Sequence, residues 1–128
     1  MRCLIDTHAF IWILTADPRL SVGARRCFHT RANEFFLSAA SVWEMAIKTS
    51  LGRLALGVDL DHLVRKEAPA RGIAHLPVEP EHALAVAALP FHHRDPFDRL
   101  LVAQARLEGL RLLSADAALD KYGVPRIW

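Results

Sequence analysis

The chain has 128 residues, 52% of them hydrophobic, which suits one compact domain over residues 1–128 that buries a core without disulfides or structural metals. Its formal net charge of +2 permits a phosphate-bearing partner but is too small to require one. Two cysteines without a signal peptide argue against a disulfide framework. No apolar run approaches the roughly 20 residues of a membrane span, so we expect a cytoplasmic protein with no membrane partner.

Apolar runs that fit β-strands alternate with helical patterns along the whole chain. Short apolar runs indicate strands, whereas apolar residues that recur every three or four positions, between capping residues such as Ser, Asp, Pro and Gly, indicate helices. In chain order, these signals predict a strand at 2–6, helices at 7–16 and 21–32, a strand at 33–39, helices at 41–52 and 59–72, a strand at 73–78, helices at 80–90 and 95–109, a strand at 110–114, a short helix after residue 116 and an edge strand at 126–128.

This alternation determines the expected fold class. A strand, a helix and a second strand form a right-handed crossover in a mainly parallel sheet, and strands that are apolar throughout suit a sheet buried on both faces. We therefore expect a three-layer α/β/α domain with a mainly parallel central sheet of four to five strands.

Four acidic residues that are far apart in the chain lie where a strand or turn leads into a helix. Asp6 and Asp116 follow predicted strands, whereas Glu44 and Asp98 are expected in the first turns of predicted helices. In a parallel sheet such positions meet at the carboxyl edge, where α/β folds build their crevices. The sequence thus predicts that the four carboxylates converge in one site.

Each of these acids also has a local structural role open to it. Glu44 can complete a capping box with Ser41, three residues before it. Asp98 in a first turn favours the helix dipole, and Asp95 just before it is expected as the N-cap of the same helix. The first and last acids can likewise cap the helices that they precede. From the residues alone, capping and metal ligation both stay open.

A cluster of carboxylates favours a hard cation, Mg²⁺ or Mn²⁺. His8, His92 and His93 lack the spacing of zinc ligands, so we expect them on loops or the surface. A hard cation lowers the pKa of a bound water and neutralises charge on a phosphodiester, which makes phosphodiester hydrolysis the matching reaction. Without the ion, the carboxylates repel one another and should raise the pKa of at least one of them.

Basic residues near the acids are candidates for contact with a substrate phosphate. They are Lys48, Arg94 and Arg99. Lys48 lies one helical turn beyond Glu44, so an ion pair between these two side chains is the alternative. Trp43, at a helical position, is expected in the core rather than as a platform for a base.

Four segments carry a resemblance to a known family. MRCLIDTHAFIWIL, SVWEMAIK, HHRDPFDRLLVAQA and LLSAD, in this order and spacing, resemble the PIN-domain ribonucleases, and specifically the VapC-type toxins of bacterial type II toxin–antitoxin systems. The resemblance covers essentially the whole chain. It implies a metal-dependent endoribonuclease whose acidic site is Asp6, Glu44, Asp98 and Asp116.

The same resemblance implies supporting residues and partners. Thr7 and Ser114 match small hydroxyl positions beside the first and last acids, where they would orient carboxylates or water. Asp95 is assigned to helix capping, and it would support the site without binding the metal itself. The implied partners are an RNA substrate, an antitoxin whose tail wraps the toxin and blocks the site, and a second copy of the chain in a homodimer.

Other classes of protein fit the sequence less well or stay open. A haloacid-dehalogenase-like phosphatase needs a second Asp two residues after the first, where this chain has His8, and no GxGxxG of a Rossmann dinucleotide domain follows the first strand. A structure-specific DNA nuclease shares the acidic architecture, and so does a catalytically silent module that binds nucleic acid or a protein partner. Parallel assays on RNA and DNA, and metal binding without turnover, distinguish these two alternatives.

Overall fold

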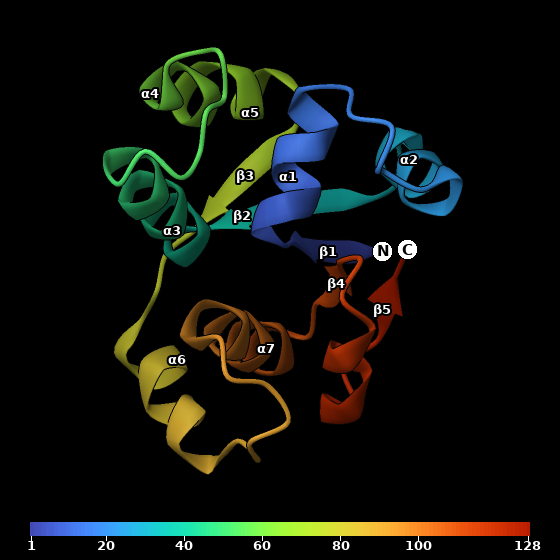
Figure 1. Cartoon of the computed structure of the whole chain (residues 1–128). Helices are drawn as coiled ribbons and strands as arrows, with labels where there is room; N and C mark the ends of the chain where they lie inside the picture. The colour runs from blue at the N-terminus through green and yellow to red at the C-terminus, as the bar shows by residue number, and fades with distance from the viewer.

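A five-stranded sheet forms the centre of the protein in the computed structural model, which describes all residues, 1–128 (Figure 1). The strand order is β3-β2-β1-β4-β5, and every neighbouring pair is parallel. The strands are β1 (Arg2–Ile5), β2 (Glu34–Ser38), β3 (Ile73–Leu76), β4 (Arg111–Leu113) and β5 (Arg126–Ile127). The expected fold class is confirmed, with five strands and a sheet that is parallel throughout.

Helices cover both faces of this sheet (Figure 1). One face carries α1 (Thr7–Leu14), α2 (Val22–His29), α3 (Ala39–Ser50), α4 (Leu60–His62), the π-helical turn η1 (Leu63–Glu67) and α5 (Ala68–Ala70). The other face carries α6 (Pro80–Ala85), the 3-10 turn η2 (Val86–Ala88), α7 (Pro96–Glu108) and the 3-10 segment η3 (Ala117–Tyr122). The single helix predicted at 59–72 is thus divided into three parts. None of the helices combines the length and apolar character of a membrane span.

The central strand β1 separates two hydrophobic cores. Cys3 and Ile5 belong to the core beneath α1, α2 and α3, whereas Leu4 between them belongs to the core around α7. All three side chains are completely buried. Successive side chains of a strand point to opposite faces, so a strand that is covered on both sides is apolar at every position. This explains why the strands read as continuous apolar runs.

The start of α3 differs from the prediction. The helix begins at Ala39, because the Ser38 hydroxyl at the end of β2 accepts the N–H of Ala40 at 3.0 Å and caps it. Ser41 therefore lies inside the helix, and its buried hydroxyl has no hydrogen-bond partner. The capping box that the sequence left open between Ser41 and Glu44 is absent. The predicted place of Glu44 in the first turn is wrong, because Glu44 lies in the middle of α3.

The start of α7 follows the prediction closely. The Asp95 carboxylate accepts the N–H of Phe97 at 2.8 Å, Pro96 occupies the first turn, and Gly109 ends the helix with a φ of 66°. Leu101 is completely buried on the inner face of the helix. The capping role predicted for Asp95 is confirmed, and Asp98 lies in the first turn as expected.

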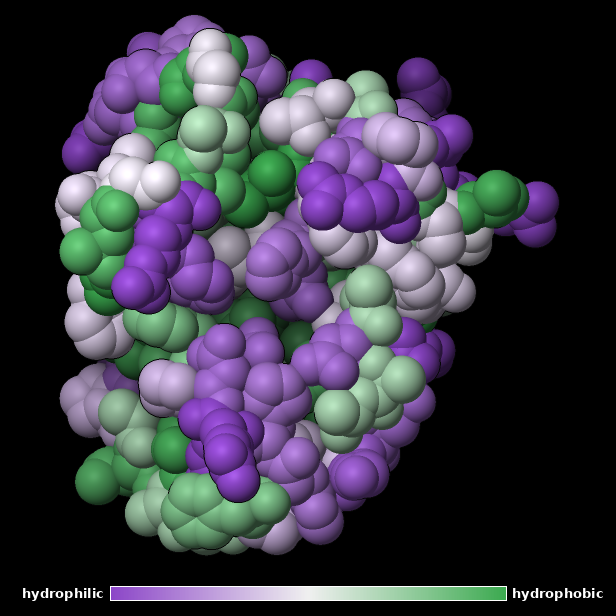
Figure 2. Space-filling view, in the orientation of Figure 1, coloured by the Kyte–Doolittle hydropathy of each residue, from purple (hydrophilic) through white to green (hydrophobic).

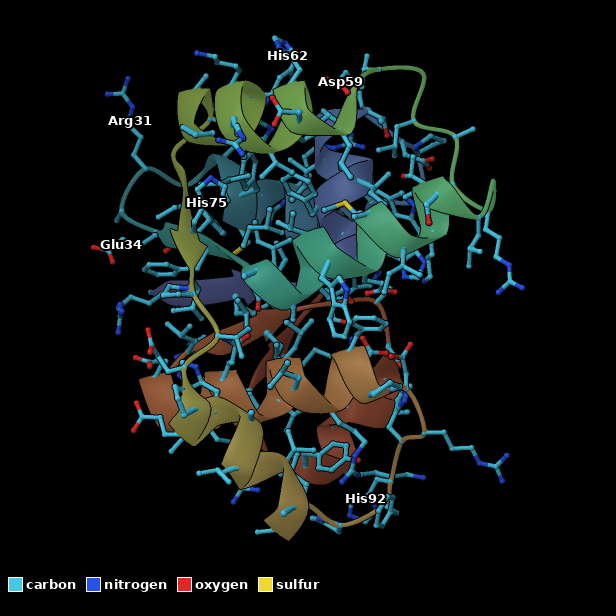
Figure 3. All side chains as sticks on the ribbon, turned by 90° about the vertical axis from the view of Figure 1, so that its left-hand side faces the viewer. Arg31, Glu34, Asp59, His62, His75 and His92 are labelled. Carbon is cyan, nitrogen blue, oxygen red and sulfur yellow. The ribbon has the colours of Figure 1, made fainter.

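Beyond the carboxyl edge of the sheet, α3 and α7 contact each other directly, although they cover opposite faces (Figure 3). Trp43 of α3 packs edge-to-face on Phe97 of α7, with 5.2 Å between ring centroids. The prediction that Trp43 belongs to the core is wrong, because this side chain is 61% exposed. The contact holds together the two helices that carry Glu44 and Asp98.

Candidate functional site

Asp6 lies at the point where β1 ends and α1 begins. Its carboxylate accepts the N–H of Ala9 at 2.7 Å, so it caps α1, and the residue is almost completely buried. Burial raises the pKa of Asp6, while hydrogen bonds from Ser114 and the Ala9 N–H act in the opposite direction. Capping and membership of the acidic cluster are therefore compatible for this residue.

Glu44 points inward from the middle of α3 and is 2% exposed. The Thr7 hydroxyl donates to Glu44 Oε1 at 2.6 Å, and the Lys48 ammonium forms an ion pair with Glu44 Oε2. Both carboxylate oxygens thus have partners, and the charge is neutralised locally. The ion pair that the sequence left open between Lys48 and Glu44 is present.

Asp98 is the acid whose charge is least well compensated. Burial, then the charges of Asp95, Asp6 and Glu44, raise the pKa of Asp98 to about 7, although His93 acts in the opposite direction. The expectation that one carboxyl group of the cluster has a raised pKa is confirmed. Contacts between their neighbours bring the acids together: Thr7, next to Asp6, bonds to Glu44. Trp43, next to Glu44, packs on Phe97, next to Asp98.

Asp116 completes the cluster after β4. Its Oδ1 accepts the N–H of Ala118 at 3.0 Å, which caps η3, and its own N–H donates to the Ser114 hydroxyl at 3.1 Å. Its Oδ2 lies 2.7 Å from His93 Nε2. One side-chain atom each of His93, Asp98 and Asp116 lie within 4.8 Å of one another. Acidic groups able to hold a metal ion are therefore present at this edge of the sheet.

His93 is the residue of this site that the sequence interpretation missed. His93 lies on a loop as predicted, but its ring lies between Asp98 and Asp116, and 19% of its side chain is exposed. The Asp95 N–H donates to His93 Nδ1 at 3.0 Å. A histidine two residues before a helix N-cap can turn its ring back toward the helix start in this way, and this spacing is the signal that could have identified it.

Of the three basic candidates, only two are available at the site. Lys48 is paired with Glu44, and Arg94, on the loop just before Asp95, is exposed and forms no hydrogen bond or ion pair within the chain. The assignment of Arg99 to substrate binding is wrong. Its guanidinium is buried, 5% of the residue being exposed, and it donates to the carbonyl oxygens of residues 86, 89 and 90.

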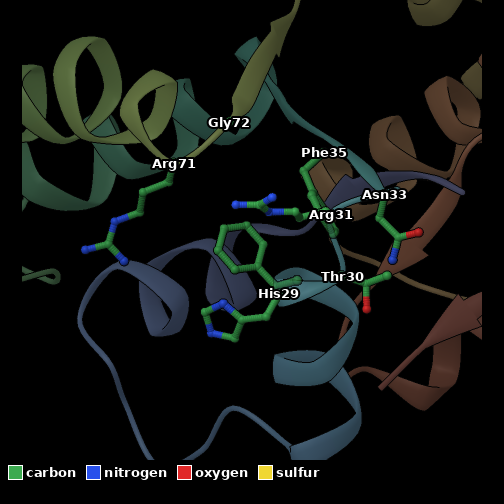
Figure 4. Close-up of a pocket in the computed structure, with 8 residues that line it drawn as sticks. His29, Thr30, Arg31, Asn33, Phe35, Arg71 and Gly72 are labelled. Carbon is green, nitrogen blue, oxygen red and sulfur yellow. The ribbon is translucent and has the colours of Figure 1, made fainter.

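The acids do not line the largest cavity. Figure 2 shows hydrophilic side chains gathered in the middle of the face that Figure 1 presents, between α3 and α7. The largest cavity, of about 520 Å³, lies at the amino edge of the sheet and is lined by His29, Arg31 and Arg71 among others (Figure 4). The two edges of the sheet thus differ in charge, and only the carboxyl edge carries the cluster of acids.

The donor set at the carboxyl edge suits a hard divalent cation. Asp6, Asp98 and Asp116 offer carboxylate oxygens, which are the ligands that Mg²⁺ and Mn²⁺ prefer. Burial and mutual repulsion raise the pKa of Asp98, so a cation would relieve an electrostatic cost that the protein itself leaves uncompensated.

Comparison with known proteins identifies the family. A family model described as PIN domain matches residues 3–125. Ribonuclease VapC22 of Mycobacterium tuberculosis is 30% identical over 124 residues, which cover 96% of this chain and 93% of the relative.

Solved structures share the fold at low sequence identity. The structure described as VapBC2 from Rickettsia felis bound to a DNA fragment from their promoter has a TM-score of 0.72 at 10% identity, over 98% of this chain and 97% of the other. VapBC-1 from nontypeable Haemophilus influenzae has a TM-score of 0.64 at 14% identity, over 98% and 96%. FitAcB from Neisseria gonorrhoeae has a TM-score of 0.62 at 18% identity, over 97% and 95%. The chain therefore belongs to the PIN-domain family and, within it, to the VapC-type toxins.

Proposed function

We propose that this protein is a metal-dependent endoribonuclease, the toxin of a type II toxin–antitoxin pair, which hydrolyses RNA phosphodiester bonds in the cytoplasm. The observation that carries the proposal is the convergence of Asp6, Glu44, Asp98 and Asp116 at one edge of the sheet, where Asp98 has a pKa raised to about 7. Membership of the VapC-type family supports the same reaction.

The roles of the acids follow from their hydrogen bonds. Asp6, Asp98 and Asp116 would hold one or two Mg²⁺ or Mn²⁺ ions, because no lysine or arginine side chain pairs with any of these three carboxylates. When bound, such an ion lowers the pKa of a water and neutralises charge on the phosphodiester. The Lys48 ammonium already neutralises the charge of Glu44, and Thr7 donates to its other oxygen, so Glu44 would orient the site through water.

Other residues would support these acids. Thr7 holds Glu44 in place by its hydrogen bond. Ser114 accepts the N–H of Asp116 and also lowers the pKa of Asp6. Asp95 fixes the first turn of α7 and so the direction of Asp98. Lys48 and Arg94 are the cations that remain available for a substrate phosphate.

Two protein partners complete the proposal. An antitoxin is supported by the solved relatives with the same fold, which are VapBC and FitAB assemblies. A homodimer follows from the family resemblance, and light scattering of the purified protein measures it directly.

The deciding experiment is cleavage of structured RNA by the purified protein with Mg²⁺ or Mn²⁺, with EDTA, and with Asp98→Asn. Asp61→Asn is the matched control, because Asp61 is an exposed acid on α4 that pairs only with Arg65. Cuts that need metal and Asp98, and persist in Asp61→Asn, are the expected result. Cleavage of DNA in preference to RNA would point to the DNA nuclease, and metal binding without cleavage of either polymer to a silent binding module.

A further inference from the structure

We propose that His93 is a positioning residue of the acidic centre, which donates its Nε2–H to Asp116 and Asp98 and does not itself ligate the metal. The inference rests on the proposed metal-dependent function. From the sequence, His93 is not expected to bind a metal, because it lacks the spacing of zinc ligands. In the structure it lies close enough to Asp98 and Asp116 to be taken for a third ligand.

The hydrogen bond at the other ring nitrogen determines which atom carries the proton. His93 Nδ1 accepts the backbone N–H of Asp95 at 3.0 Å, so Nδ1 must present its lone pair. The single proton of the neutral imidazole is then on Nε2, which lies 2.7 Å from Asp116 Oδ2 and 3.4 Å from Asp98 Oδ2. To ligate a metal, Nε2 would have to lose this proton to Nδ1, and the Asp95 N–H would lose its acceptor.

The loop that carries His93 is held in place by buried groups. The Tyr122 hydroxyl accepts the backbone N–H groups of His92 and His93 at 3.2 and 3.0 Å, and it also lies 3.2 Å from the Arg99 guanidinium. Arg99 in turn donates to the carbonyl oxygen of residue 86 in η2 and to those of residues 89 and 90 at the start of the same loop. Its guanidinium lies over the Phe91 ring, 4.2 Å from the centroid. Figure 3 shows this loop, marked by His92, running up to the start of α7.

This scaffold gives Arg99 a role that the sequence did not suggest. A buried guanidinium needs several acceptors, and the loop carbonyls supply them, so the loop is fixed relative to α7. Because α7 also carries Asp98, the His93 ring is held at a fixed place between Asp98 and Asp116.

At the proposed metal centre, His93 would orient the carboxylate of Asp116. Its Oδ1 is fixed by the Ala118 N–H and its Oδ2 by His93, so the plane of the carboxylate is set on both sides. Groups that hydrogen-bond to ligating carboxylates typically change metal affinity by about 10- to 100-fold when they are removed. The His93 N–H also lies between two carboxylates that would otherwise repel each other.

Two substitutions of His93 distinguish the roles of its two ring nitrogens. His93→Asn keeps an acceptor near the position of Nδ1 for the Asp95 N–H but removes the donor, whereas His93→Gln keeps a donor near the position of Nε2. The control is His92→Asn, which removes the exposed neighbouring imidazole of the same loop. Mn²⁺ affinity of the full chain is measured by calorimetry, without RNA, and pulsed electron paramagnetic resonance of bound Mn²⁺ reports any nitrogen ligand.

We expect His93→Asn to weaken Mn²⁺ binding about 10- to 100-fold. His93→Gln and His92→Asn should stay close to the wild-type affinity, and bound Mn²⁺ should show no coupling to an imidazole nitrogen. Unchanged affinity in a folded His93→Asn protein would overturn the inference, and so would an imidazole coupling that both His93 variants lose. If His93→Asn does not fold, the affinity of His93→Gln decides. If the wild-type protein binds no Mn²⁺, the proposed metal-dependent function fails, and this inference fails with it.

Discussion

The two sides of the acidic site are built differently, although both belong to one cluster. On the α3 side, Glu44 has a partner for each oxygen, Thr7 and Lys48, so its charge is compensated within the protein. On the α7 side, Asp98 and Asp116 pair with no lysine or arginine and share only His93 between them, and burial raises the pKa of Asp98 to about 7. Under the proposed metal-dependent function, a cation would neutralise the carboxylates of the α7 side, whereas the charge of Glu44 on the α3 side is already compensated by Lys48.

The largest expected effect tests this asymmetry by metal binding. Asp116→Asn should weaken Mn²⁺ binding by more than about 100-fold, because a direct ligand contributes more than the groups that orient ligands. Glu44→Gln should weaken it by less than about 10-fold, since Lys48 already neutralises the charge of Glu44. Calorimetry on both purified variants makes the comparison. Equal losses in the two variants would show that Glu44 is a ligand of the same rank, and the asymmetry would be refuted.

A second test uses the pH dependence of stability without metal. The pKa of Asp98 is about 7 in the folded protein, against an ordinary value of 3.8. Between these two pH values, the folded state therefore keeps a proton on Asp98 that the unfolded state has released. The unfolded state then binds fewer protons, and the free energy of unfolding falls as the pH rises from about 4 to about 7. Below this window the stability is fully present, and above it the loss is complete.

Denaturant unfolding in EDTA at several pH values measures this decrease. Asp98→Asn should flatten it, whereas Asp61→Asn, an exposed acid elsewhere, should leave it unchanged. Added Mn²⁺ should restore more stability at pH 8 than at pH 5, because the ionised carboxylate is the form that binds it. A pH profile that is identical in wild type and Asp98→Asn would mean that Asp98 is compensated as well as Glu44.

The third test removes the partner that makes the α3 side complete. Lys48→Met leaves the Glu44 carboxylate, whose side chain is 3% exposed, with only the Thr7 hydroxyl as a partner. Loss of a partner from a buried polar group costs about 1–3 kcal/mol of unfolding free energy. Lys66→Met, at an exposed lysine of η1, is the control. If both variants lose the same stability in urea, the ion pair does not support the fold.

Most of the fold could be predicted from the sequence, because its signals are local. Buried strands appear as apolar runs, and the N-cap Asp95 followed by Pro96 defines the start of α7 before any tertiary contact is known. The predicted start of α3 differs from the observed one because Ser38 and Ser41 are equally good N-cap residues. Which serine caps the helix depends on where β2 ends, and local sequence leaves that open.

The site was predictable in part for the same reason. The four acids lie at or near the ends of elements, and a parallel sheet brings such ends together. Arg99 and His93 depend on tertiary contacts instead. The carbonyl oxygens that bind Arg99 lie before the start of its helix, and Asp116, on one side of His93, follows β4. Arg94 and Arg99 lie in the same polar segment, and the local sequence does not indicate that Arg94 is exposed and Arg99 buried. The assignment of Arg99 to substrate binding is wrong for this reason.

The smallest expected effect concerns Trp43, the side chain that was wrongly expected in the core. It is 61% exposed and packs with neither hydrophobic core, so Trp43→Ala should cost about 1 kcal/mol or less, chiefly from the edge-to-face contact with Phe97. Met45→Ala, at a completely buried position of the same helix, should cost about 2–5 kcal/mol. Urea unfolding of both variants at low protein concentration measures the difference. A cost for Trp43→Ala as large as that for Met45→Ala, and growing with protein concentration, would mean that a second copy of the chain covers Trp43, and the α3 side of the site would then be completed by a partner subunit.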